Sequence, residues 1–225
     1  MERFQSTQLT LKNMTKEQKR QDFLDSYFDG FKKLLPTLTQ ETFLKYYDES
    51  QYGGYPEEPG GSVWESEGKS IYVLIRILKP KKILEIGNYM GKSSNHILQA
   101  VEDNKVGEVT LLDIVERIDY NSIHNKNFNR VLNNSLIELD APFDYDLIVQ
   151  DGDHTYPNVK KELELIFKHS QSKSLHIWAH DYYTVKPPQC EVAKAWDEVV
   201  DKFNTISLFK DSVSNCGCLI AHFNK

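Results

Sequence analysis

The chain has 225 residues, 40% of them hydrophobic, which suits one domain with an appendage rather than two full domains. Its 27 basic and 33 acidic side chains give a net charge of −6. The basic residues form no cluster that could bind along the phosphates of a nucleic acid, which argues against a nucleic acid partner. No apolar run approaches the length of a membrane span, and the N-terminus lacks the apolar core of a signal peptide. We therefore expect a soluble, cytoplasmic protein that does not bind membranes.

The three cysteines, Cys190, Cys216 and Cys218, form no even disulfide framework. The Cys-x-Cys pair lies in a predicted strand rather than in a metal knuckle. We expect reduced thiols that pack in the interior.

The N-terminal part predicts helices. Apolar residues recur at helical spacing from Phe23 to Leu35, which predicts a helix broken near Gly30 and ended by Pro36. Residues 39–50 predict a short second helix, and residues 51–62 form a loop with four glycines and two prolines. We therefore divide the chain into an N-terminal helical region with a Tyr/Gly-rich loop at 1–60 and a main domain at 61–225.

Four tyrosines of the N-terminal region suit a lid that closes over an aromatic or sugar acceptor. They are Tyr46, Tyr47, Tyr52 and Tyr55. An ordinary core helix followed by a linker is the simpler explanation of the same residues.

The remainder alternates strand-like and helix-like segments, in the manner of a parallel sheet with crossover helices. The predicted helices lie at 71–78, 93–101, from Pro157 onward and at 192–203, and the predicted strands at 82–87, 108–114, 129–134, 145–151, 175–181, 205–210 and 216–223. The short turn at 211–215 makes the last two strands antiparallel neighbours. The predicted fold is α/β, a doubly wound, mostly parallel, seven-stranded Rossmann-like sheet with an antiparallel C-terminal strand and an N-terminal helical appendage.

A glycine turn follows the first predicted strand, where doubly wound sheets bind ligands. After Glu85 come Gly87 and Gly91, whose missing side chains let the backbone approach a ligand at a helix N-terminus. The Gly-x-x-x-Gly spacing matches neither a dinucleotide fingerprint nor a Walker loop, which argues against a nucleotide triphosphate. A tight turn without any ligand is the alternative.

This acid-x-Gly-x-x-x-Gly turn resembles the first motif of class I S-adenosylmethionine-dependent methyltransferases, which holds the methionine end of the cofactor. The resemblance implies that Gly87 and Gly91 allow close backbone approach. It also places Glu85 on the ammonium side and Ser93, at the helix start, near the carboxylate of the cofactor.

Two further strand ends support a nucleoside ligand. The second predicted strand ends at Asp113, whose carboxylate can accept two hydrogen bonds from ribose hydroxyls. The third leads to Asn133, Asn134 and Ser135, short polar residues that suit contact with adenine but also make good turns.

A second cluster of ionisable residues follows the strand at 145–151. Asp151, Asp153 and His154 come directly after it, and the neighbouring strand at 175–181 ends in His180 and Asp181. Carboxylates from two adjacent strand ends, with water, suit a hard ion such as Mg²⁺ or Mn²⁺ in an open site. We expect Asp153 to cap the next helix, and His154 is the group suited to accept a proton near neutral pH.

The Asp-Gly-Asp-His and later His-Asp pairs resemble the methyltransferase branch that includes macrocin O-methyltransferase-like and cephalosporin hydroxylase-like proteins, from about Glu65 to the C-terminus. The resemblance implies that Asp151, beside the cofactor, and Asp181 bind a divalent metal and that His154 is the general base. His180 stands where those members can have Glu. A histidine still coordinates manganese or iron, so we include His180 among the ligands, although the change also fits a degraded metal site.

These observations predict a metal-assisted O-methyltransferase that uses S-adenosylmethionine and a small-molecule acceptor such as a sugar, polyol or phenol. One alternative is a hydroxylase-like oxidoreductase that uses the His-Asp metal site. Another is a non-catalytic cofactor-binding module that retains the fold. The sequence is compatible with a homo-oligomer and does not specify one.

Overall fold

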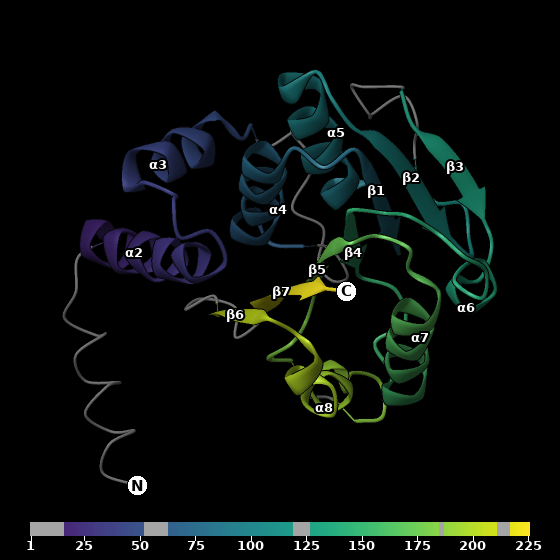
Figure 1. Ribbon diagram of the computed structural model, residues 1–225. Coiled ribbons are helices and arrows are strands. Elements are labelled where there is room, and N and C mark those ends of the chain that lie inside the picture. The colour runs from purple at the N-terminus through teal and green to yellow at the C-terminus, as the bar shows by residue number, and fades with distance from the viewer. Residues whose placement is uncertain (1–15, 52–62, 119–126, 185–186, 211–216) are drawn as a thin grey trace, which may run out of the picture.

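The computed structural model describes residues 16–51, 63–118, 127–184, 187–210 and 217–225. Seven strands form one sheet in the order β3-β2-β1-β4-β5-β7-β6, with helices on both faces (Figure 1). The five strands from β3 to β5 are parallel, and β7 is antiparallel to both β5 and β6. The predicted fold class is confirmed.

The strands coincide closely with the predicted segments, since short apolar runs covered on both faces are characteristic of parallel sheets. Their bounds are β1 Lys82–Ile86, β2 Glu108–Asp113, β3 Asn129–Leu132, β4 Leu147–Gln150, β5 Ser174–Ala179, β6 Thr205–Lys210 and β7 Gly217–Asn224. The predicted turn between β6 and β7, with Cys216, lies outside the described residues. Cys190 and Cys218 are both buried, as predicted, and form no disulfide with each other.

The helices form a layer on each face of the sheet (Figure 1). On one face lie α2 (Lys16–Leu34), α3 (Gln40–Glu49), α4 (Glu65–Leu78) and α5 (Lys92–Asn104). On the other lie α6 (Ser135–Glu138), α7 (Tyr156–His169) and α8 (Val192–Asp197). Each layer packs its apolar side chains against the sheet and forms its own core. Among the described helices, none has the length and apolar character needed to cross a membrane.

The helix predicted to break near Gly30 is instead continuous from Lys16 to Leu34. A methyl group at Gly30 would lie 2.5 Å from Cε1 of Phe209 in β6, so the missing side chain lets α2 approach the sheet edge. The hydroxyl of Ser207 also donates to the Gly30 carbonyl at 2.7 Å. The glycine therefore serves helix-to-strand packing rather than a break.

The N-terminal helices share the core of the sheet. Side chains from Leu24 to Tyr47 are buried in the same cluster as those of α4 and α5. Tyr47 is buried. The guanidinium carbon of Arg76 lies 4.6 Å from the centroid of the Tyr46 ring. Tyr52 and Tyr55 lie outside the described residues, so the predicted lid and the division at residue 60 stay predictions.

Two predicted helix bounds were wrong. Helix α4 begins at Glu65 rather than at residue 71. The prediction began too late because the residues before 71 are polar and show no apolar periodicity. The segment 192–203 is not one helix: α8 ends at Asp197, and a 3₁₀ turn, η1, spans Val200–Lys202. This break lets Phe203 pack with its ring centroid 5.1 Å from that of Trp196.

Candidate active site

A pocket of about 600 Å³ opens at the carboxyl ends of β1, β2, β4 and β5. The strand order reverses between β1 and β4, the position where open α/β sheets bind ligands. Seven of the predicted site residues line this pocket: Gly87, Asp113, Ser135, Asp151, His154, His180 and Asp181. Four separate strand ends therefore meet at one site, as the sequence predicted.

Gly87 and Gly91 both adopt the left-handed backbone region, with φ of 80° and 86°. The N–H of Gly87 donates to the carbonyl of Leu112 at 2.8 Å, and a Cβ at Gly87 would lie 2.0 Å from the carbonyl oxygen of Asp151. Gly91 is the N-cap of α5. The turn is thus closed tightly against the end of β4, which no other residue type would permit.

Glu85 and Ser93 lie beneath the turn and not in the pocket lining. The Glu85 carboxyl is fully buried and accepts a hydrogen bond from the Ser94 hydroxyl. Burial raises the pKa of Glu85 to about 8, with the hydroxyls of Ser93 and Ser94 opposing the rise. In this structure both residues support the turn from inside, and their predicted contacts with the methionine end stay predictions.

Asp113 accepts hydrogen bonds from two backbone N–H groups at the rim of the pocket. Its Oδ2 accepts the N–H of Tyr89 at 2.9 Å, and its Oδ1 accepts the N–H of Val115 at 3.1 Å. Each carboxylate oxygen has two lone pairs, so one remains on each oxygen for a ribose hydroxyl. The geometry is compatible with the predicted ribose contact.

Ser135 begins α6, and its hydroxyl donates to Oε1 of the buried Glu162. Glu162 also accepts from Gln150 at 2.7 Å and from Asn158 at 3.0 Å. Burial raises the pKa of Glu162, and these hydrogen bonds oppose the rise. Since the Ser135 proton is already engaged, its oxygen would act as an acceptor toward a ligand amino group. No sequence pattern indicated Glu162.

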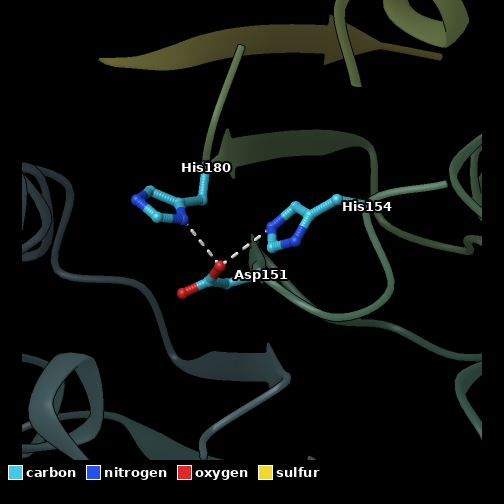
Figure 2. Close-up of side chains that lie close together, drawn as sticks. All are labelled: Asp151, His154 and His180. Carbon is cyan, nitrogen blue, oxygen red and sulfur yellow. Dashed lines mark hydrogen bonds and ion pairs between the residues drawn. The ribbon is translucent and has the colours of Figure 1, made fainter. Parts of the chain in front are cut away.

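Two histidine side chains lie close to one carboxylate oxygen of Asp151 (Figure 2). Asp151 Oδ1 is 3.1 Å from Nε2 of His154 and 2.8 Å from Nδ1 of His180. Among the described residues, these three side chains form a group whose potential metal-ligating atoms lie within 4.8 Å of one another. Two imidazoles and one carboxylate therefore converge at the end of the pocket.

The interactions within this cluster favour an ionised Asp151 and protonated histidines. Burial alone would raise the pKa of Asp151 and lower the pKa of His154 and His180. The mutual charges and hydrogen bonds outweigh burial: the pKa of Asp151 falls, that of His154 rises, and that of His180 rises well above its usual value. The site therefore attracts a cation, either a proton or a metal ion.

Asp181 and Asp153 line the pocket but face other partners. The Asp181 carboxylate accepts from the Thr184 hydroxyl at 2.9 Å and lies 3.8 Å from Nε2 of His180, outside the three-residue cluster. Its predicted role as a ligand stays a prediction. Asp153 does not cap α7 as expected: the N-cap is Thr155, and Asp153 accepts the Thr155 N–H in the turn before the helix.

Glu67 of α4 is a component of the site that sequence reasoning missed. It is fully buried, and its Oε2 lies 3.0 Å from Nε2 of His180. His180 therefore lies between two carboxylates, Asp151 on the pocket side and Glu67 in the interior. A lone glutamate in a polar helix start carried no signal of this contact.

Residues 84–182 match the family model Methyltransf_24, a methyltransferase domain. A search of curated proteins found no match. Solved structures with the same fold include an O-methyltransferase from Bacillus cereus in complex with SAH, at 17% identity and a TM-score of 0.59, over 90% of this chain and 100% of that chain.

Two other solved structures have similar scores. The O-methyltransferase TomG from Streptomyces achromogenes, involved in tomaymycin synthesis and solved with SAM, has 15% identity and a TM-score of 0.56 over 87% of this chain and 94% of that chain. A methyltransferase from Geobacter sulfurreducens has 16% identity and a TM-score of 0.56 over 89% and 95%. These likenesses confirm the fold, and the matched segment contains the glycine turn and the Asp151 cluster. Residues 84–182 are therefore similar to a methyltransferase domain, and the chain has the fold of these solved methyltransferases.

Proposed function

We propose that this protein is an S-adenosylmethionine-dependent methyltransferase, which transfers the methyl group to a hydroxyl oxygen of a small acceptor, a sugar, polyol or phenol. The observation that carries the proposal is the Asp151–His154 pair at the end of the pocket, 3.1 Å apart. A hydroxyl is a weak nucleophile until a base removes its proton, whereas the sulfonium methyl group needs only in-line alignment. O-methyltransferases with the same fold support the choice of oxygen.

His154 is placed for that proton transfer. Its side chain is 24% exposed, so a pocket ligand can reach it, while Asp151 is only 12% exposed. When Asp151 accepts the Nε2–H, the lone pair of the neutral imidazole is on Nδ1, and Nδ1 takes the hydroxyl proton. Asp151 then stabilises the imidazolium that forms, as a carboxylate does beside any catalytic histidine.

The cluster also fits a divalent metal ion. Nδ1 of His180 lies 2.8 Å from Asp151 Oδ1, so after losing its proton it can bind a cation together with that oxygen. Imidazole and carboxylate donors suit Mn²⁺ better than Mg²⁺. We propose that Asp151 and His180 hold the ion, with Asp181 nearby. When bound, such an ion lowers the pKa of an acceptor hydroxyl.

His154 cannot be both a metal ligand through Nε2 and the base through Nδ1, because a neutral imidazole that coordinates through Nε2 keeps its proton on Nδ1. We assign the base role to His154. The assignment predicts that removing the imidazole slows methyl transfer without weakening Mn²⁺ binding.

The test uses S-adenosylmethionine labelled in its methyl group with a panel of phenols, sugars and polyols. The wild type should methylate a hydroxyl, chelator should slow the reaction, and Mn²⁺ should restore it. His154→Ala should reduce the rate by about 10²–10⁴-fold with unchanged affinity for S-adenosylmethionine and Mn²⁺. His169→Ala is the matched control, because His169 lies 3.2 Å from Asp140 in another Asp–His pair outside the pocket lining.

Three results would contradict parts of the proposal. Label on nitrogen or sulfur, with no hydroxyl acceptor in the panel, would exclude O-methylation of these classes. Equal activity of His154→Ala and His169→Ala would exclude the base. Loss of Mn²⁺ binding in His154→Ala would make His154 a ligand instead.

A second candidate function follows from the same donor set. Two histidines and one carboxylate are also the ligands of non-haem Fe(II) oxygenases, which favours the hydroxylase-like alternative. Oxygen consumption by the Fe²⁺-loaded protein with the acceptor panel, in the absence of S-adenosylmethionine, would support it. Methyl transfer without any oxygen consumption would exclude it.

A further inference from the structure

Glu67 is a buried carboxylate with an incomplete set of partners. Its Oε2 accepts the backbone N–H of Trp64 at 2.9 Å and lies 3.0 Å from Nε2 of His180. Its Oε1 has no hydrogen-bond partner among the described residues. A fully buried carboxylate with an unsatisfied oxygen is costly to keep in a folded protein, so its presence calls for a reason.

The start of α4 does not require this charge. Glu67 is the third residue of the helix, where either Glu or Gln can accept the N–H of the preceding N-cap. A neutral amide would cap the helix at a smaller desolvation cost. The negative charge therefore matters to the other neighbour of Oε2, His180.

His180 is restrained on three sides. Its ring stacks on Trp178, with centroids 5.8 Å apart and planes 10° apart. Nε2 faces Glu67, and Nδ1 faces Asp151. The Trp178 indole in turn donates to the Ser70 hydroxyl at 3.0 Å, and that hydroxyl donates to the backbone carbonyl of Glu67 at 2.6 Å. Helix α4 and strand β5 thus hold the imidazole in one orientation.

The orientation decides which nitrogen serves the pocket. An imidazole must give up one of its two protons before it binds a metal ion, and it then has one N–H and one lone pair. When Glu67 accepts the Nε2–H, the lone pair is on Nδ1, which is the atom beside Asp151 Oδ1. Without that acceptor, the proton could move to Nδ1 and donate to Asp151, which would remove the lone pair from the pocket side.

We propose that Glu67 is a positioning residue of the active site, which keeps the proton of His180 on Nε2 so that Nδ1 and Asp151 together face a cation. The part that concerns a metal ion depends on the function proposed above. Outer carboxylates that accept the second N–H of a metal-binding histidine commonly set its tautomer and basicity. Glu67 has that relation to His180 although it comes from a helix that precedes the whole glycine turn.

The experiment compares the wild type, Glu67→Gln and Tyr72→Phe as full-length, metal-free proteins labelled with ¹⁵N in histidine. Glu67→Gln keeps an acceptor for the Trp64 N–H and removes the charge. Tyr72→Phe is the matched control, because Tyr72 is buried in the same helix and its hydroxyl bonds Asp103 and Arg76, away from His180. The readouts are the ¹⁵N–¹H signal of His180 Nε2–H and its exchange with solvent, followed by Mn²⁺ affinity from titration.

We expect a slowly exchanging Nε2–H signal in the wild type and in Tyr72→Phe, and a shifted, faster-exchanging or absent signal in Glu67→Gln. Mn²⁺ affinity should fall about 10–100-fold in Glu67→Gln and stay unchanged in Tyr72→Phe. Wild-type signal and affinity in Glu67→Gln would overturn the proposal, and so would an equal loss in Tyr72→Phe.

The role of Glu67 can be tested even if the wild type binds no Mn²⁺ or Glu67→Gln does not fold. If the wild type binds no Mn²⁺, the metal part of the proposed function fails, while the Nε2–H signal still decides the role of Glu67. If Glu67→Gln does not fold, Glu67→Asp replaces it, because that change keeps the charge and withdraws the carboxylate by one carbon. It should weaken the same signal, and an unchanged signal would overturn the proposal.

Discussion

Replacing Gly87 by alanine tests the central geometric feature of the site, the contact between the glycine turn and the end of β4. The added Cβ would lie 2.0 Å from the Asp151 carbonyl oxygen and 2.5 Å from its carbon. Since Cβ atoms essentially never approach closer than 3.0 Å, the two segments must separate by about 1 Å. The φ of 80° costs a non-glycine residue a further ~1–2 kcal/mol.

This separation moves both sides of the pocket, the turn and Asp151. Losing one hydrogen bond to a charged ligand costs about 1.5–3 kcal/mol, or about 10–150-fold in dissociation constant. We therefore expect Gly87→Ala to bind S-adenosylmethionine about 10–150-fold more weakly and to lose stability. Isothermal titration calorimetry measures the affinity, and urea unfolding monitored by circular dichroism measures the stability.

Gly107→Ala is the matched control. Gly107 also has a positive φ, 120°, and its Cβ would lie 3.0 Å from the Pro80 carbonyl. It precedes β2 at the amino edge of the sheet, opposite the pocket. Gly107→Ala should lose stability through backbone strain and keep the affinity of the wild type. Equal affinities in the two variants would refute the reasoning, whether both stay tight or both weaken.

Three further predictions concern affinity, pH dependence and packing. Asp113→Ala should weaken S-adenosylmethionine binding by at least about tenfold, measured by calorimetry, because ribose hydrogen bonds and the Tyr89 contact are both lost; unchanged affinity would exclude the ribose contact. The folded-state pKa of Glu85, about 8, is above its unfolded value, so the folded protein binds the extra proton and stability falls as pH rises from about 4.5 to 8. Glu85→Gln should flatten that fall in urea unfolding, and an unaltered slope would contradict the burial of an ionisable carboxyl. Gly30→Ala should lower the free energy of unfolding by about 1 kcal/mol, because the ~1–3 kcal/mol cost of overpacking against Phe209 exceeds the ~1 kcal/mol gain in helix propensity. A higher urea midpoint would show instead that the Phe209 ring moves aside at little cost.

The sequence predicted most of the sheet because its signals are local. An apolar run such as that from Ile83 to Ile86 specifies a strand covered on both faces, whatever lies elsewhere in the chain. The position after each strand then follows from topology, since parallel strands end at one edge. The sequence therefore predicts that Asp113, Asp151 and His180 meet at one pocket, and all three line it.

The same reasoning failed where the local pattern was ambiguous. Gly30 suggested a break because glycine disfavours helices, but its packing partner, Phe209, is far along the chain. Asp153 suggested a helix cap because it precedes a proline, and the helix begins too late for it to serve. In both cases a neighbour in space, or a difference of two positions, changed the role of the residue.

By itself the sequence determined the strands, the glycine turn and the acids and histidines that end the strands, because each depends on residues close together along the chain. Only the tertiary structure decided which partners those groups have. Glu67 reaches His180 across 113 positions, and Glu162 reaches Ser135 from another helix. Contacts of this kind leave no periodic or spaced pattern, since they are set by how the helices pack on the two faces of the sheet.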